Sequence, residues 1–203
     1  MKKSEISLLC GFVLTVVISL VSHQLYDAQQ VRQNTLRLHI IANSNSQQDQ
    51  NIKLNVRDII LAHDEALAVN ADTFSQAVNI AQENTKAIEN RVNEYLETVN
   101  VPYTAKCSVE SFYFDTTQYD GFVLPKGEYA AFTVRLGEAV GKNWWCVMYP
   151  ALCSRSCGEV QLENSDGFIK TSKITPRFKI VEVYENIKTK LFGIGTDQYE
   201  NLD

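Results

Sequence analysis

An uncharged apolar run near the N-terminus limits more than any other feature what this chain can be. The run covers Ile6–Ser22, 17 residues without a charge, and follows Lys2 and Lys3. A positive end before an apolar core is the layout of an export signal, and this length is also the short limit of a membrane span. We therefore predict a signal peptide or membrane anchor over residues 1–25, with the rest of the chain exported.

The sequence leaves open whether this segment is cleaved. No clean Ala-x-Ala site follows the apolar run, and Ser22 and Ala28 are the nearest small residues at cleavage positions. Residues 26–35 are polar and rich in Gln, which predicts a short stalk. The remaining residues, 36–203, have the length and hydrophobic content of a single extracytoplasmic domain.

Charge and histidine content exclude several classes of function. The chain has 19 basic and 24 acidic residues, a net charge of −5, and no long block of like charge. A dedicated nucleic-acid surface is therefore not expected. Three scattered histidines supply no pair at zinc-ligand spacing. We predict no metal site and no cofactor.

Export changes how the cysteines are interpreted. Cys10 lies inside the apolar run. Four cysteines then remain outside the cytoplasm, Cys107, Cys146, Cys153 and Cys157. An even number of exported cysteines favours disulfides over metal ligation or catalysis. The natural pair is Cys146–Cys153. Cys107–Cys157 is then a possible second pair, although Cys146–Cys157 also stays open.

The first half of the domain alternates strand and helix signals. Leu36–Ile41 alternates apolar and polar residues, which predicts a strand with one buried face. A helix follows to about Leu67, and a second runs from near Thr73 until Pro102 closes the segment. Four residues at the turn after the strand and at the start of the first helix are typical of a turn and helix cap: Asn43, Ser44, Ser46 and Asp49.

Strand signals dominate the second half. A period of two predicts strands over Tyr103–Phe114 and Glu128–Leu136, separated by a loop at Asp115–Gly127. An amphipathic helix is predicted after Thr175-Pro176, up to about Leu191. The fold class is therefore α+β, a small mainly antiparallel sheet packed with about three helices.

Gly141–Cys157 is the most unusual stretch, because it holds both tryptophans and three of the five cysteines. As an extended segment it places Trp145, Val147 and Tyr149 on one face, and Trp144, Cys146 and Met148 on the other. Apolar residues on both faces indicate either a covered strand or a surface that expects a partner. The candidate partner-binding residues are Asn143, Trp144, Trp145, Tyr149, Pro150 and Leu152.

No catalytic motif stands out, and we expect no enzyme activity. There is no Gly-x-Ser-x-Gly and no glycine-rich phosphate loop, and Asp115-Thr116-Thr117 lacks the glycine of an aspartic-protease turn. One alternative is an exported cysteine-dependent hydrolase or cell-wall enzyme that uses Cys146 with His39 as its base. Outside that alternative, His39 is expected to be an ordinary hydrogen-bonding residue. A third hypothesis is a protein that acts at a lipid surface.

Three blocks in order make the chain resemble the stage II sporulation protein R family. They are Leu36–Asp58 (LRLHIIANSNS, then DQ, KL and VRD), Phe122–Tyr129 (FVLPKGEY), and Leu136–Cys153 (LGE, then GKNWWCVMYPALC). The resemblance implies a signalling protein of a Gram-positive endospore former. Such a protein is made in the forespore and exported into the space between the two membranes.

The resemblance also implies a partner. Members of the family are thought to activate a membrane-bound aspartic protease of the mother cell, which cleaves the pro-peptide of sigma-E. The expected contacts are thus this protease and, through the N-terminal segment, the membrane. The family supplies no partner-contact residues, so the candidate partner-binding residues named above are our own hypothesis.

Overall fold

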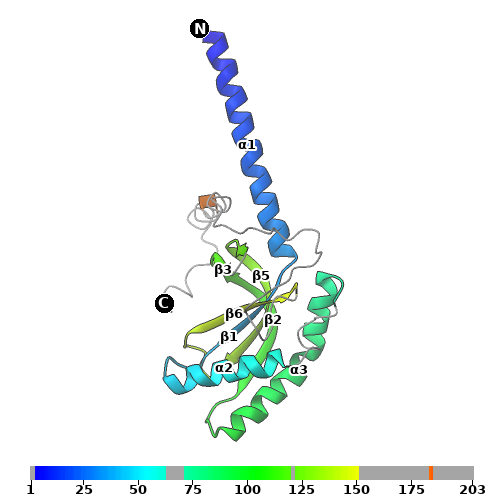
Figure 1. The fold of residues 1–203 in the computed structure, drawn as a ribbon, viewed down its shortest axis with the longest axis vertical. Helices are drawn as coiled ribbons and strands as arrows, with labels where there is room; N and C mark the ends of the chain where they lie inside the picture. Colours follow the sequence, from blue (N-terminus) through cyan, green and yellow to red (C-terminus); the bar gives the residue numbers. More distant parts are fainter. Residues whose placement is uncertain (1–2, 63–70, 120–121, 151–182, 185–203) are drawn as a thin grey trace. The chain divides into compact units, whose positions relative to one another are not determined.

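The fold is described from a computed structural model, which covers residues 3–62, 71–119, 122–150 and 183–184 (Figure 1). The chain divides into two compact units. The first comprises Met1–Arg32, Phe114–Gly127 and Gly167–Ile194, and the second Gln33–Tyr113, Glu128–Asp166 and Gly195–Asp203. The predicted helix after Thr175-Pro176 lies outside the described residues, apart from positions 183 and 184.

The predicted export segment and the predicted stalk form one helix, α1, over Lys3–Gln33. The polar residues after the apolar run are thus helical, because Gln, Asp and Arg are compatible with helix and no Gly or Pro interrupts them. The helix is long and apolar enough to cross a membrane. A signal sequence near the N-terminus has the same properties.

A small hairpin follows in the same unit. Strand β3 covers Thr117–Tyr119 and strand β4 covers Phe122–Leu124; they pair antiparallel, with Tyr119 opposite Phe122. The rings of that pair stack with centroids 4.9 Å apart. The sequence prediction of a loop here was wrong, because strands of three residues are too short to show a period of two.

The second unit is built on a four-stranded sheet in the order β2-β5-β1-β6. β1 is Leu36–Ile41, β2 Ala105–Phe114, β5 Gly127–Leu136 and β6 Asn143–Tyr149. β1 pairs parallel with β5 and antiparallel with β6. The predicted α+β class with a mainly antiparallel sheet is confirmed.

Two helices pack against one face of this sheet: α2, Gln47–Leu61, and α3, Phe74–Thr98 (Figure 1). Both begin at the predicted caps. The Ser46 side chain accepts a hydrogen bond from the Asp49 N–H, and the Thr73 side chain accepts one from the Gln76 N–H. The first helix ends at Leu61, with Ala62 as its C-cap, so the predicted end near Leu67 was wrong. Residues 63–70 lie outside the described residues.

The core between helices and sheet uses the expected apolar stripes. Its strand members include Leu36, Leu38, Ile40, Phe132, Val134 and Met148; its helix members include Ile52, Val56, Ile60, Ala81, Val92 and Leu96. The prediction of a single buried face for β1 was wrong. The side chains on its other face are buried too, with Arg37 0% and His39 1% exposed, as its position between two strands favours.

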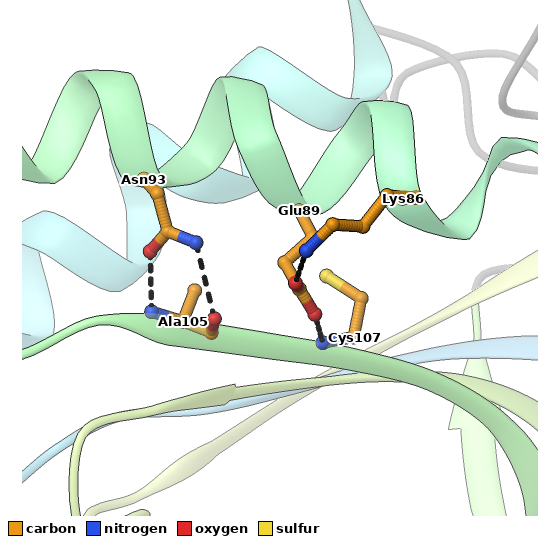
Figure 2. A network of polar contacts seen from close by, with 5 residues as sticks. All are labelled: Lys86, Glu89, Asn93, Ala105 and Cys107. Carbon is orange, nitrogen blue, oxygen red and sulfur yellow. Dashed lines mark hydrogen bonds and ion pairs between the residues drawn. The ribbon is translucent and has the colours of Figure 1, made fainter.

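Side chains of α3 bond the backbone of β2, at one end of the strand order (Figure 2). The Asn93 amide oxygen accepts from the Ala105 N–H at 2.7 Å, and its NH₂ donates to the Ala105 carbonyl at 3.2 Å. A Glu89 oxygen accepts from the Cys107 N–H at 3.0 Å, while Lys86 binds the other oxygen. The two side chains thereby occupy backbone groups that an added strand would use.

Candidate interaction surface

Strand β6 lies at the opposite end of the strand order and carries both tryptophans. Register places Trp145 opposite His39 and Trp144 opposite Ile40 on β1, so the two indoles leave opposite faces of the sheet. Trp144 packs at the edge of the helix-side core. Trp145 is 40% exposed. We define Asn143–Pro150 as the tryptophan surface.

The predicted alternation fails at the end of this strand. The pairing shifts between Leu36 and Arg37, so that Leu36 lies opposite Tyr149 while Arg37 lies opposite Val147. Tyr149 therefore packs with the helix-side core, not on the face of Trp145. Its hydroxyl donates to the Asp72 carbonyl, just before α3, at 3.4 Å. A bulge of this kind leaves no signal in a strict period of two.

The predicted cap residues form a polar cluster around Asp49. Asn43 and Ser44 donate to one carboxylate oxygen at 2.9 and 2.5 Å, and the Tyr103 hydroxyl donates to the other at 2.5 Å. Burial acts to raise the pKa of Asp49, but the hydrogen bonds from Ser44, Tyr103 and Asn43 outweigh it and hold that pKa below its usual value. The carboxylate thus joins the turn, α2 and the segment before β2.

The same turn holds the connection between β5 and β6. The Asn43 side-chain oxygen accepts from the Glu138 N–H at 3.0 Å, and that of Asn45 accepts from the Lys142 N–H at 2.7 Å. Gly141 passes so close that an added Cβ would lie 2.3 Å from the Ser44 carbonyl oxygen. Glycine is required there by the close approach of the two backbones.

Lys53, a buried residue of α2, fixes the start of β6. Its ammonium donates to the carbonyls of Lys142 and Asn143 at 3.0 and 3.3 Å, and to the Gln50 side chain at 2.7 Å. Burial, with a further contribution from the Lys142 charge, lowers the pKa of Lys53. One turn further along α2, the Arg57 guanidinium lies 5.5 Å from the centroid of the Trp144 ring.

His39 holds the same strand from the other face. Its Nε2 lies 2.8 Å from the Asn143 side-chain oxygen, and its ring meets Phe112 edge-on with centroids 4.3 Å apart. Burial lowers the pKa of His39 to about 4, so the ring is neutral at pH 7 and Nε2 donates. The expected hydrogen-bonding role of His39 is confirmed.

Cys146 is disulfide-bonded, and its partner lies outside the described residues. The pairing with Cys153 stays a prediction, as do the roles of Leu152 and Cys157. Cys107 is a free thiol, so the possible pair Cys107–Cys157 is not formed. Burial, with the nearby Glu89 charge, raises the pKa of Cys107 to about 12. Counting cysteines missed this, because an even number does not bring two thiols together.

The geometry also bears on a Cys146–His39 dyad. Cys146 lies opposite Leu38, whose side chain leaves the face of the sheet opposite to that of His39. A disulfide sulfur has no thiolate to act as nucleophile. Within the ranges that the structure describes, no three His, Cys, Asp or Glu side chains gather as metal ligands.

The structure brings together most of the predicted surface and cap residues, but sequence reasoning missed three that contact them. The sequence analysis gave Lys53, Arg57 and Tyr103 no role beyond the predicted helix and strand that contain them. The spacing of four between Lys53 and Arg57 gave a usable signal, because it puts both on one side of α2.

Comparison with known proteins shows which family the sequence resembles. A scan of protein families matches residues 32–159 to stage II sporulation protein R. The stage II sporulation protein R of Bacillus subtilis (strain 168) is 32% identical over 133 residues, which cover 64% of this chain and 59% of that protein. The match thus spans about three fifths of the relative's length. No solved structure matches.

Proposed function

Because the chain belongs to the stage II sporulation protein R family, we propose that it is an exported signalling protein of endospore formation. It acts in the space between the forespore and mother-cell membranes. There it activates a membrane-bound aspartic protease of the mother cell, which then processes pro-sigma-E. The N-terminal apolar helix is compatible with export or anchoring and supports this location.

The observation that carries the proposal is an exposed indole on a strand that is held rigidly from several sides. Lys53 bonds the carbonyls at the start of β6, His39 bonds Asn143, and Cys146 is tied by a disulfide. Trp145 nevertheless stays 40% exposed. Exposed tryptophan on a preorganised element is typical of interface hot spots, since little side-chain entropy is lost on binding.

An activator of this kind works only by differential affinity. It must bind the active arrangement of the protease more tightly than the inactive one, and a 100-fold preference shifts that equilibrium by about 2.7 kcal/mol. A rigid surface suits this task, because it fits one arrangement of its partner and not the other.

The test is reconstituted processing. The full chain, exported, is produced with the membrane-bound protease and pro-sigma-E, and cleavage of pro-sigma-E is followed on gels. We expect processing to depend on this chain and to fall at least tenfold in Trp145→Ala. Tyr26→Ala, which removes an aromatic ring 60% exposed in the other unit, should process normally. Processing without the chain, or full processing by Trp145→Ala, contradicts the proposal.

The rival function, an exported cysteine-dependent hydrolase or cell-wall enzyme, needs a thiolate at Cys146. Titration of the Cys146 thiol in the exported, folded protein distinguishes the enzyme hypothesis from the signalling hypothesis. A reactive Cys146 thiol with a low pKa favours the enzyme, whereas a Cys146 that reacts only after reduction favours the signal.

A further inference from the structure

Helix α1 changes character along its length. From Ile6 to Leu20 its apolar side chains are exposed all round, and Val21 is half-buried. From Leu25 onward one side of the helix has neighbours, at Leu25, Ala28 and Arg32. These positions are three and four residues apart and therefore lie on one face.

That face packs on the segment after β3. Ala28 is 0% exposed and clusters with Leu25 and with Val123 of β4. The Arg32 guanidinium donates to the Lys126 carbonyl at 3.0 Å. Gly127 has a φ of +141°, and an added Cβ would lie 2.6 Å from Arg32 Cδ. Leu25, Ala28 and Arg32 therefore belong to a folded unit that also contains residues 122–127.

The apolar part of the helix suits a bilayer. A helix that is apolar all round matches lipid, whereas a protein groove would need only one apolar stripe. Ile6–Ser22 spans about 26 Å as a helix, near the roughly 30 Å of a hydrocarbon core. Lys3 lies at the end that stays in the cytoplasm, as the distribution of positive charge in membrane proteins requires.

The packing of α1 on residues 122–127 bears on whether the helix is removed by cleavage. Cleavage after Ala28 would delete two of the three α1 residues that pack on 122–127. We propose that α1 is retained as a transmembrane anchor whose partner is the lipid bilayer. Residues 122–127 clamp its extramembrane end, within about one turn of the apolar run.

The first test produces the full chain in a Gram-positive host. The mass of the protein in the membrane fraction is measured, and its extraction by alkaline carbonate is followed. We expect an intact N-terminus and resistance to alkaline carbonate. A chain cut between residues 22 and 28 overturns the proposal, and so does an uncut chain that carbonate releases. The double variant Ser22→Ala/Gln24→Ala introduces an Ala-x-Ala site that keeps the packed face, and should be cut and released.

The clamp has its own test, by limited trypsin digestion of the membrane-bound chain. Arg32 is a trypsin site, and the clamp should protect it. Gly127→Leu should increase cutting at Arg32 at least tenfold. The matched control is Gly11→Leu in the same helix, where an added Cβ meets nothing within 4 Å; it should leave cutting unchanged.

If Gly127→Leu does not fold, Val123→Ala tests the same contact with a smaller increase. Equal cutting at Arg32 in wild type, Gly127→Leu and Val123→Ala would refute the clamp. These measurements of mass, extraction and proteolysis do not involve pro-sigma-E, so they stand or fall separately from the proposed signalling.

Discussion

The two edge strands of the four-stranded sheet, β2 and β6, differ in what binds them. At β2, Asn93 and Glu89 of α3 bond the backbone of Ala105 and Cys107 in place of another strand (Figure 2). At β6, the contacts from α2 and β1 hold the start of the strand and leave Trp145 exposed. Natural proteins protect sheet edges against unwanted pairing, and β2 is protected in this way.

The difference separates a structural region from a candidate recognition region. Residues Trp144–Pro150 carry no charge, so none of the usual edge lysines keeps a partner away. Changes at β2 should therefore alter stability alone. Changes to the exposed residue of β6 should alter signalling alone. Residues that hold the start of β6 should affect both.

The largest expected effect on stability is at Asp49, which ties the turn to the support of β6. Asp49→Ala leaves the Asn43, Ser44 and Tyr103 donors without their common acceptor. We expect a loss of about 4 kcal/mol in the free energy of unfolding, because hydrogen bonds to a buried charge are strong. Urea unfolding measures it. A loss below 1 kcal/mol would show that the cluster is not central.

The next effect is a dependence on pH that differs between the two ends. The pKa of His39 is lowered from 6.5 to about 4, so the unfolded chain binds a proton more readily than the folded one. The contribution of neutral His39 to the free energy of unfolding is complete above pH 6.5. It is lost as pH falls towards 4, and the loss is at most roughly 3 kcal/mol. The His39→Gln variant should lack this slope.

At the β2 end of the sheet, the titrating group is the Glu89 carboxylate. Lys86, together with the Cys107 N–H, lowers the pKa of Glu89 from 4.5. Its stabilising contribution is present above pH 4.5 and is lost as pH falls through the lowered value. Unfolding curves of Glu89→Gln should therefore differ from wild type in slope only below about pH 4.5. A change in slope between pH 4.5 and 6.5 in Glu89→Gln would contradict the separation.

Removing the cover of β2 should have an intermediate effect. Asn93→Ala leaves the Ala105 N–H and carbonyl without this side chain, at a cost of about 2 kcal/mol. Asn93→Asp keeps the acceptor and loses the donor, and should cost less. Thermal unfolding gives both values. Signalling at a temperature where both variants are folded should remain unchanged.

The smallest effect is expected at Arg57, which lies over Trp144. Arg57→Met should cost about 0.5–1 kcal/mol through the lost cation–π contact and leave the strand in place. Chemical denaturation measures the difference, and Asp58→Asn serves as a control for the neighbouring ion pair. A larger loss would place Arg57 among the residues that hold β6.

Local patterns predicted the elements whose signals are complete within a few residues. Ser46 and Thr73 marked both helix starts, and the alternation in Leu36–Ile41 marked β1. The same alternation misled about burial, because Arg37 and His39 read as solvent-facing. Their burial depends on β1 lying between β5 and β6, and this strand order is set by residues 94 to 113 positions away.

In the candidate site, too, local patterns missed what depends on residues far away in the sequence. Trp144, Trp145 and the turn residues could be identified from composition and spacing. Their supports are less visible. The spacing of Lys53 and Arg57 puts both on one side of α2, but nothing local shows that Lys53 reaches Lys142 and Asn143 across the fold. The bulge that turns Tyr149 away from Trp145 and the free thiol at Cys107 likewise depend on three-dimensional neighbours.

The central claim is tested most directly by measuring pro-sigma-E processing and unfolding free energy together, in Trp145→Ala and Asn93→Ala. We predict that Trp145→Ala abolishes processing with a stability loss of at most about 1 kcal/mol, whereas Asn93→Ala is less stable and processes normally. Normal processing by folded Trp145→Ala would contradict the account, because the exposed strand would then not be the surface that signals.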